Sequence, residues 1–185
     1  KNIRRGSIKC LFLNTFFFTK LTQNGRYTYK NVKRWTKSIK LKKKGLNNIK
    51  NIFELDKIFI PVHVGLVHWC LGCINIKEQS IEYYDSMCGS ETTFVDCIRK
   101  YINDEYNDKK VNNYQLNDVY KWNIITNNKI NGPRQLNAYD CGVFTCQFAN
   151  HFCDNMSPNF TQNDMPYFRK RMILEIINNK CIDDP

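Results

Sequence analysis

The middle of the chain holds three closely spaced segments with strand-forming side chains, and these constrain the fold more than any other feature. Residues 57–63 are rich in β-branched and aromatic residues, and residues 67–76 and 80–85 follow soon after. Only the short polar segment 77–79 separates the last two. Two strand-like runs joined by such a break predict an antiparallel hairpin. We therefore expect a β-sheet at the centre of the chain.

Segments with helical periodicity follow these strands in the sequence. Residues 91–107 carry apolar side chains on one helical face, residues 141–152 suit a buried helix, and an amphipathic helix is expected over 164–179. The remaining expected elements are strands over 8–13 and 119–125 and helices over 14–21 and 29–38. The last helix is expected to turn inward Phe168, Met172, Ile173 and Ile176. Helices around a central run of strands predict an α+β fold, in one domain because no repeat or linker interrupts the chain.

The composition is that of a globular protein. Hydrophobic residues make up 42% of the chain and aromatic residues 14%, which excludes an intrinsically disordered protein. No stretch approaches the roughly 20 apolar residues that a membrane-spanning helix needs. We therefore expect a domain with a real core and no membrane association.

The nine cysteines are odd in number and lack the spacing of a disulfide framework. Free thiols in a reducing compartment are the simpler interpretation. Cys70 and Cys73 form the one close pair, whereas a zinc site usually takes its four ligands from two such pairs. We expect both to be small apolar strand residues, and we expect no metal and no cofactor. Cys146 and Cys153 are likewise expected to pack inertly in an aromatic-rich helix.

The chain carries a formal net charge of +11, and much of it lies in one basic run. The run comprises Lys33, Arg34, Lys37, Lys40, Lys42, Lys43 and Lys44. It can be a solvated surface loop, a surface for an acidic protein partner, or a contact for nucleic acid. Trp35 is the only aromatic residue among these lysines, and no nucleic-acid-binding motif accompanies them. Nucleic acid is therefore an unfavoured partner.

His68 begins the second strand of the expected hairpin region, and Asp85 ends the third. In an antiparallel pair these two ends lie side by side, so the carboxylate can reach the imidazole, fix its tautomer and stabilise its protonated form. A lone histidine on an apolar strand is more often a packed residue; His63 and His151 are the other two histidines. The pair is a candidate base with its orienting group.

Cys141 lies where a loop becomes the helix expected over 141–152. A helix N-terminus favours a thiolate, and Asp140 is a candidate N-cap just before it. Gly142 lets another backbone approach closely. The Gln135 amide, on the same loop, can donate to an oxygen that develops charge beside the sulfur. From these residues alone, inert packing and nucleophilic catalysis are equally weighted interpretations of Cys141.

Three segments together resemble the Ulp/SENP cysteine proteases, which process and remove the modifier SUMO. They are His-Trp at 68–69, Tyr-Asp-Ser at 84–86, and Pro-x-Gln-x-Asn-x-x-Asp-Cys-Gly at 133–142. The segments NTFFFTKL and KNVKRWTK, at 14–21 and 30–37, are also similar to the family. Residue type, order and spacing agree, and the resemblance covers nearly the whole chain.

This resemblance implies a papain-like or adenain-like cysteine protease fold, in which helices flank a central mixed sheet. It implies a catalytic triad of Cys141, His68 and Asp85, with Gln135 as the oxyanion donor. The implied activity is hydrolysis of the peptide or isopeptide bond after the C-terminal Gly-Gly of SUMO, in maturation and deconjugation. The alternatives are a protease for another ubiquitin-like modifier and a non-cleaving SUMO-binding domain.

On the substrate side, the resemblance implies that Trp69 covers the Gly-Gly tail and that Phe16 contacts the modifier. Asp140 and Gly142, which flank Cys141, complete the expected substrate-binding residues. The implied partners are SUMO and SUMO-conjugated proteins, and we expect a monomer. The expected location is nuclear or at the nuclear envelope, with the cytoplasm as the alternative.

The chain departs from the family pattern at its start. Family members begin with a Trp-Leu-x-Asp segment and a helix, and the tryptophan of that segment closes the other side of the glycine tunnel. No segment here matches it, because the three tryptophans are Trp35, Trp69 and Trp122. The protease domain over residues 1–185 is therefore expected to be N-terminally incomplete.

Overall fold

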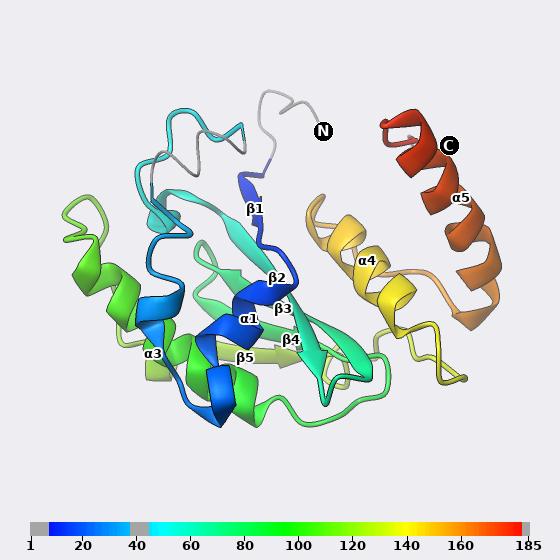
Figure 1. Cartoon of the computed structure of the whole chain (residues 1–185), viewed down its shortest axis with the longest axis horizontal. Coiled ribbons are helices and arrows are strands. Elements are labelled where there is room, and N and C mark those ends of the chain that lie inside the picture. The colour runs from blue at the N-terminus through cyan, green and yellow to red at the C-terminus, as the bar shows by residue number, and fades with distance from the viewer. Residues whose placement is uncertain (1–7, 38–44, 183–185) are drawn as a thin grey trace.

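In the computed structural model, which describes residues 8–37 and 45–182, five strands form one mixed sheet (Figure 1). The strands are β1 (Cys10–Phe12), β2 (Lys57–Val64), β3 (His68–Asn75), β4 (Ser80–Tyr84) and β5 (Asn123–Thr126). They follow sequence order across the sheet. The central three strands pair in antiparallel fashion, while β1 and β5 add in parallel at the two edges. The three central strands predicted from the sequence are confirmed.

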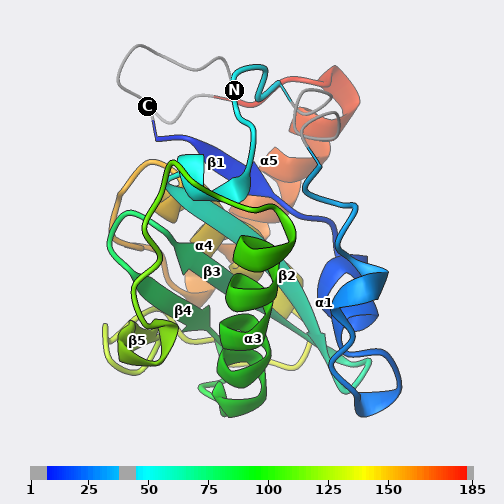
Figure 2. The ribbon, with the colours of Figure 1, turned by 90° about the vertical axis from the view of Figure 1, so that its left-hand side faces the viewer.

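Helices cover both faces of this sheet, which confirms the α+β prediction (Figure 2). The helices of the described residues are α1 (Phe16–Leu21), α3 (Thr92–Asp108), α4 (Cys141–Phe152) and α5 (Met165–Asn178). α1 and α3 pack against one face, and α4 packs against the other with α5 beside it.

The two faces of the sheet have separate hydrophobic cores because side chains alternate along each strand. On β2, Ile58 and Ile60 join the core under α1 and α3. Phe59, between them, joins Phe144 and Phe148 of α4 in the second core. A strand covered on both faces is apolar at successive positions, which explains the continuous hydrophobic run in β2.

α3 lies close against the sheet at Gly72 of β3. A Cβ atom built on Gly72 would lie 2.1 Å from the Phe94 ring, so any larger residue there would displace the helix. The face of α3 predicted to turn inward is largely buried, and Ile98, Tyr101 and Ile102 are fully enclosed. This packing positions β3, the central strand of the sheet, which begins at His68.

Residues 29–38 were expected to form a helix, and that prediction is wrong for the described part. Only a 3₁₀ turn at Tyr29–Asn31 forms, followed by irregular turns, and residue 38 lies outside the described residues. Contacts with α3 override the local helical preference. The buried Glu105 carboxylate accepts hydrogen bonds from Tyr29 Oη (2.6 Å) and Thr36 Oγ1, and the Lys109 ammonium donates to the Lys33 carbonyl. The segment is therefore held by tertiary hydrogen bonds.

The strand expected over 119–125 is shorter than predicted. Val119–Lys121 forms a 3₁₀ turn, because the Asp118 carboxylate accepts from the Tyr120 N–H and caps the turn, and the strand begins only at Asn123.

Cys146 was expected to pack inside the protein, but it is exposed on α4.

The inward face predicted for α5 is wrong in its second half. Phe168 and Met172 pack against the α4 core, but Ile173 and Ile176 are 56% and 76% exposed. The helix contacts the rest of the protein mainly through its first turns, where Met165 and Arg171 are buried. The apolar period therefore continues along the helix beyond the surface that it contacts.

No helix among the described residues is long and apolar enough to cross a bilayer.

Two lysines of the basic run are among the described residues with a known environment. Lys33 forms an ion pair with Asp108, with 3.5 Å between Nζ and Oδ1, and Lys37 is exposed. Lys40, Lys42, Lys43 and Lys44 lie outside the described residues.

Candidate active site

The imidazole of His68 and the carboxylate of Asp85 meet at one end of the β3–β4 pair. The β3–β4 ladder pairs Leu71 with Tyr84, so the next residue, Asp85, lies opposite Cys70. The side chains of Cys70 and His68 are on the same face of β3, because they are two residues apart. His68 Nε2 lies 2.7 Å from Asp85 Oδ1. The predicted proximity of the two side chains is thus present, and strand register produces it.

A tight turn after β4 holds the Asp85 carboxylate in place. Oδ1 also accepts from the Met87 N–H at 2.7 Å, and Oδ2 accepts from the Gly89 N–H at 2.9 Å. A Cβ atom at Gly89 would lie 2.7 Å from Oδ2, so the approach needs glycine. Because an ionised carboxylate only accepts, the His68 tautomer that fits carries its proton on Nε2. Nδ1 is then the free basic atom of the ring.

Cys141 is the first residue of α4 and is 6% exposed. α4 packs on β3, the strand that begins with His68. A Cβ atom on Gly142 would lie 3.8 Å from the Trp69 indole, which puts the start of α4 beside the start of β3. The predicted nucleophile, on a helix N-terminus that favours a thiolate, is therefore beside the strand that carries the predicted base.

Gln135 is buried on the loop before α4, and its side chain is anchored at both ends. Its Oε1 accepts from Ser86 Oγ at 2.6 Å, and its Nε2 donates to the Asn137 carbonyl at 2.5 Å. The Gln135 N–H also donates to the Ser86 carbonyl. A primary amide has two N–H groups, so the second hydrogen of Nε2 is the one that could serve an oxyanion.

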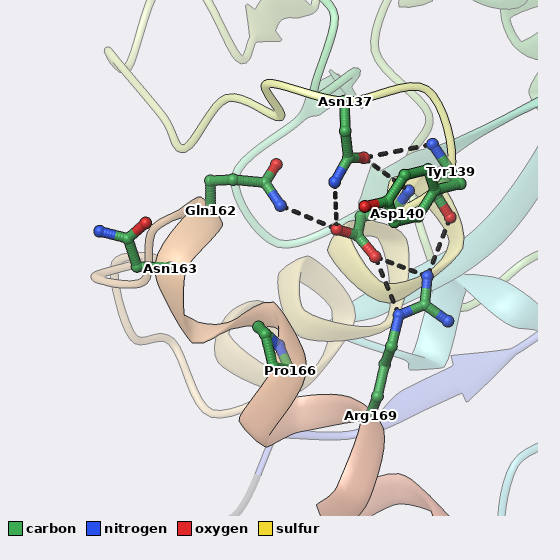
Figure 3. A pocket seen from close by; sticks show the side chains of 7 residues that line it. All are labelled: Asn137, Tyr139, Asp140, Gln162, Asn163, Pro166 and Arg169. Carbon is green, nitrogen blue, oxygen red and sulfur yellow. Dashed lines mark hydrogen bonds and ion pairs between the residues drawn. The ribbon is translucent and has the colours of Figure 1, made fainter.

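Asp140 lies at the predicted N-cap position of α4, but its side chain does not cap the helix. It turns instead toward Arg169 of α5 and toward Gln162, which lies in the 3₁₀ turn just before that helix (Figure 3). The physical reason is charge: a guanidinium offers a buried carboxylate stronger hydrogen bonds than a backbone N–H does, and Arg169 donates two of them to Oδ1. Both oxygens of the Asp140 carboxylate are therefore engaged in hydrogen bonds within the protein.

Trp69 and Phe16, the other predicted substrate contacts, differ in how firmly they are held. The Trp69 ring stacks on His63 across the β2–β3 pair, with 4.0 Å between centroids and 4° between planes. Phe16 opens α1 and is 65% exposed. Trp69 is thus a fixed wall beside Cys141, and Phe16 is an accessible aromatic surface residue.

Cys70 adds a buried thiol beneath the His68–Asp85 pair. The ligating atoms of these three residues lie within 4.8 Å of one another, the one such group among the described residues. Burial raises the pKa of the Cys70 thiol to about 12, and the nearby Asp85 carboxylate adds to the effect. A protonated thiol is not a metal ligand, and Asp85 is already engaged by backbone donors. Metal independence stays a prediction, and Cys70 is a packed strand residue, as expected.

Sequence reasoning missed the residues that hold this site together. Asn127, on the turn after β5, donates from Nδ2 to the carbonyls of Asp85 (3.1 Å) and Pro133 (2.9 Å), joining the two loops. Ser86 orients Gln135, and its place beside Asp85 was the available signal. Arg169 lies on α5, far along the chain from Asp140, and no local pattern points to it.

Comparison with known proteins supplies independent findings. The family model described as the Ulp1 protease family, C-terminal catalytic domain, matches residues 5–180. A Sentrin-specific protease of Caenorhabditis elegans is 37% identical over 174 residues, which is 94% of this chain and 22% of that protein. Ubiquitin-like-specific protease 1A of Arabidopsis thaliana is 38% identical over 175 residues, again 94% of this chain and 32% of that protein.

A solved structure of the C-terminal Ulp1 protease domain, in complex with Smt3, the yeast ortholog of SUMO, is also similar. It has a TM-score of 0.72 and 25% identity, covering 96% of this chain and 72% of the other. The fold is therefore that of a Ulp1-type catalytic domain. The chain spans less than half the length of the curated relatives described above.

Proposed function

The chain belongs to the Ulp1 protease family, C-terminal catalytic domain, and on that premise we propose that it cleaves SUMO from its precursor and from its conjugates. The bond broken is the peptide or isopeptide bond after the C-terminal Gly-Gly. The observation that carries the proposal is the His68–Asp85 pair at 2.7 Å beside the helix that begins with Cys141. The similar Ulp1 domain that was solved in complex with a SUMO ortholog supports the choice of modifier.

Acylation starts when His68 Nδ1 takes the proton of the Cys141 thiol. The sulfur attacks the carbonyl carbon of the last glycine of the modifier, and the carbonyl oxygen becomes an oxyanion. The Cys141 N–H and the second Nε2 hydrogen of Gln135 donate to that oxyanion. His68 then gives its proton to the leaving nitrogen as the C–N bond breaks. The products of this half-reaction are a free amine and a thioester on Cys141.

Deacylation repeats the sequence with water. His68 Nδ1 takes a proton from the water as its oxygen attacks the thioester carbonyl. The C–S bond breaks, the modifier leaves with a free carboxyl group, and the proton on His68 returns to the sulfur. Throughout, Asp85 accepts from Nε2–H and stabilises the protonated ring without taking its proton.

Substrate selection combines a narrow passage with a separate docking surface. Trp69, held flat by His63, forms a wall over the Gly-Gly tail, and a residue with a side chain would collide with it. The exposed Phe16 contacts the body of the modifier. Gly142 lies beside the indole, where a Cβ atom would be 3.8 Å from the ring, and Asp140 contributes its backbone. Modifier binding supplies affinity, and the passage supplies selectivity for glycine.

The proposal extends to the setting of the protein. SUMO and SUMO-conjugated proteins are its partners, it acts as a monomer without metal or cofactor, and it works in the nucleus or at the nuclear envelope. Residues 1–185 form one protease domain, and adding a Trp-Leu-x-Asp segment at its N-terminus is expected to raise its activity. The sentrin-specific and ubiquitin-like-specific protease names of its relatives support the pathway.

The test is a panel of reporters fused after the C-terminal Gly-Gly of SUMO, of ubiquitin and of another ubiquitin-like modifier. We expect cleavage of the SUMO reporter and at least a tenfold lower kcat/KM for the others. Preference for a different modifier would replace the substrate but keep the chemistry. Tight SUMO binding without cleavage of any reporter, measured also with an equivalent N-terminal segment supplied, would show a binding domain and contradict the proposal.

A further inference from the structure

A buried carboxylate connects the residue before Cys141 to α5. Asp140 is 3% exposed. Its Oδ1 accepts from Arg169 Nε at 2.9 Å and from an Arg169 terminal nitrogen at 2.5 Å. Its Oδ2 accepts from Asn137 Nδ2 at 2.6 Å and from Gln162 Nε2 at 2.8 Å. Figure 3 shows these side chains converging on Asp140 from the loop and from the α5 end.

The backbone around Asp140 is held as firmly as its side chain. The N–H groups of Tyr139 and Asp140 both donate to Asn137 Oδ1, at 3.2 and 3.1 Å. The Tyr139 carbonyl accepts from Arg169 at 2.9 Å. The Asp140 carbonyl accepts from the Phe144 N–H, the first hydrogen bond of α4. The peptide that carries the Cys141 N–H is therefore fixed in direction.

Asn137 links this anchor to the other oxyanion donor. Its side chain binds Asp140 on one side, and its carbonyl accepts from Gln135 Nε2 at 2.5 Å on the other. The Gln135 amide and the Cys141 N–H, which must point at the same oxygen, are thus set by one hydrogen-bonded unit. Arg169 closes that unit from α5.

We propose that Arg169 is a positioning residue for the nucleophile, which fixes the loop before Cys141 and compensates the buried charge of Asp140, the residue before Cys141. The proposal rests on Cys141 being the nucleophile of the proposed function. Two consequences follow from the geometry. Loss of the planar guanidinium loosens both oxyanion donors, and loss of its charge leaves an uncompensated buried carboxylate on the residue before Cys141.

The charge consequence has a definite sign. Burial by itself would raise the pKa of Asp140, but hydrogen bonds from Asn137, Arg169 and Gln162 lower it below its usual range, so Asp140 is ionised near neutral pH. An uncompensated negative charge beside Cys141 disfavours its thiolate. On the sheet side, the titratable groups of the site are His68, Cys70 and Asp85, and none of them contacts Arg169 in the described hydrogen bonds. Their influence should be the same in each variant compared.

The experiment measures alkylation of Cys141 by iodoacetamide as a function of pH, with the labelled peptide quantified by mass spectrometry. This readout isolates Cys141 from the other eight cysteines and needs no modifier substrate. For Arg169→Gln we expect the pH midpoint to rise by about 0.5–1 unit. Asp140→Asn should lower the midpoint, and the double variant should return toward the wild-type value.

Arg169→Lys separates charge from geometry. Lysine keeps the positive charge but cannot reproduce the paired N–H groups of guanidinium. The pH midpoint should stay near that of the wild type, while kcat on a cleaved reporter falls about tenfold with KM little changed. This second arm depends on turnover, and the alkylation arm does not, so failure of the proposed function leaves the charge test intact.

Arg171→Gln is the matched control, because Arg171 lies on the same helix and pairs with Glu175 at 3.2 Å instead. It should lower thermal stability without moving the alkylation midpoint. If Arg169→Gln behaves like Arg171→Gln, with lower stability and an unchanged midpoint, Arg169 is merely structural and the proposal is overturned. If Asp140→Asn does not fold, the double variant and Arg169→Lys still decide the outcome.

Discussion

The two halves of the candidate site are held in different ways. The His68–Asp85 half is placed by the ladder between β3 and β4 and by the backbone donors of one turn. The Gln135–Cys141 half lies on a loop and a helix start, and side chains hold it: Ser86, Asn137 and Arg169. Strand register leaves few alternatives, whereas a loop anchored by side chains depends on each anchor. Because the loop half has several separate anchors, removing one of them should lower activity only in part.

The largest effect should come from the nucleophile itself, in the loop half. Cys141→Ser should remove essentially all turnover, because a serine hydroxyl is a far weaker nucleophile beside the same base. Fold and modifier binding should stay intact, as measured by thermal melting and by SUMO affinity. Cys146→Ser, an exposed cysteine on the same helix, is the control and should retain activity. Substantial activity in Cys141→Ser would remove Cys141 from the mechanism.

Single substitutions in each half rank the two. Among His68, Asp85 and Gln135, His68→Ala should lower kcat most, since the base acts in both acylation and deacylation. Asp85→Asn should follow, because the ring keeps a partner but loses the tautomer that leaves Nδ1 free. Gln135→Ala should cost least, about 10²–10³ in kcat, as expected for one oxyanion donor. Steady-state kcat values in another order would contradict these roles.

The rigidity of the sheet half can be tested at Gly89. A Cβ there would lie 2.7 Å from Asp85 Oδ2, so Gly89→Ala should displace the carboxylate and lower kcat by about tenfold or more. Ser90→Ala, at the adjacent exposed position, should be neutral. Wild-type kinetics for Gly89→Ala would mean that the turn tolerates movement and that register alone does not fix the pair.

The smallest expected effect is at Ser86, which supports Gln135. Ser86→Ala removes the hydrogen bond to Gln135 Oε1 and should lower kcat by about three- to tenfold, with KM nearly unchanged. In a Gln135→Ala background the same substitution should add little, because the two residues act as a unit. Full additivity of the two substitutions would show that Ser86 does not act through Gln135.

The contrast between the halves also explains what the sequence could predict. The hairpin spacing placed His68 beside Asp85, because strand register follows from alternation and a short break. The loop-to-helix transition located Cys141 and Gln135 on one loop. The partner of Asp140 could not be inferred, because Arg169 lies on a separate helix and ion pairs between elements leave no periodic signal. The exposed Ile173 was mispredicted for a related reason: a helical period does not tell how far the packed surface extends.

The same limit appears in the fold. The segment after Tyr29 has helical composition, yet hydrogen bonds to the buried Glu105 hold it in irregular turns. Val119 was expected in a strand, but the Asp118 cap starts a turn there instead. Local pattern predicts elements well where burial and periodicity agree, as in β2 and α3. It fails where a single side chain decides the backbone, either from another element, as Glu105 does, or from the residue before a turn, as Asp118 does.

The most direct test of the central claim is labelling with SUMO that carries an electrophile in place of its C-terminal carboxyl group. Such a probe reacts only when the modifier docks, the tail enters the passage and an activated thiol meets it. We predict one covalent adduct, mapped to Cys141 by peptide mass spectrometry, that is lost in Cys141→Ser and strongly slowed in His68→Ala. An adduct on another cysteine, or labelling undiminished by His68→Ala, would contradict the account.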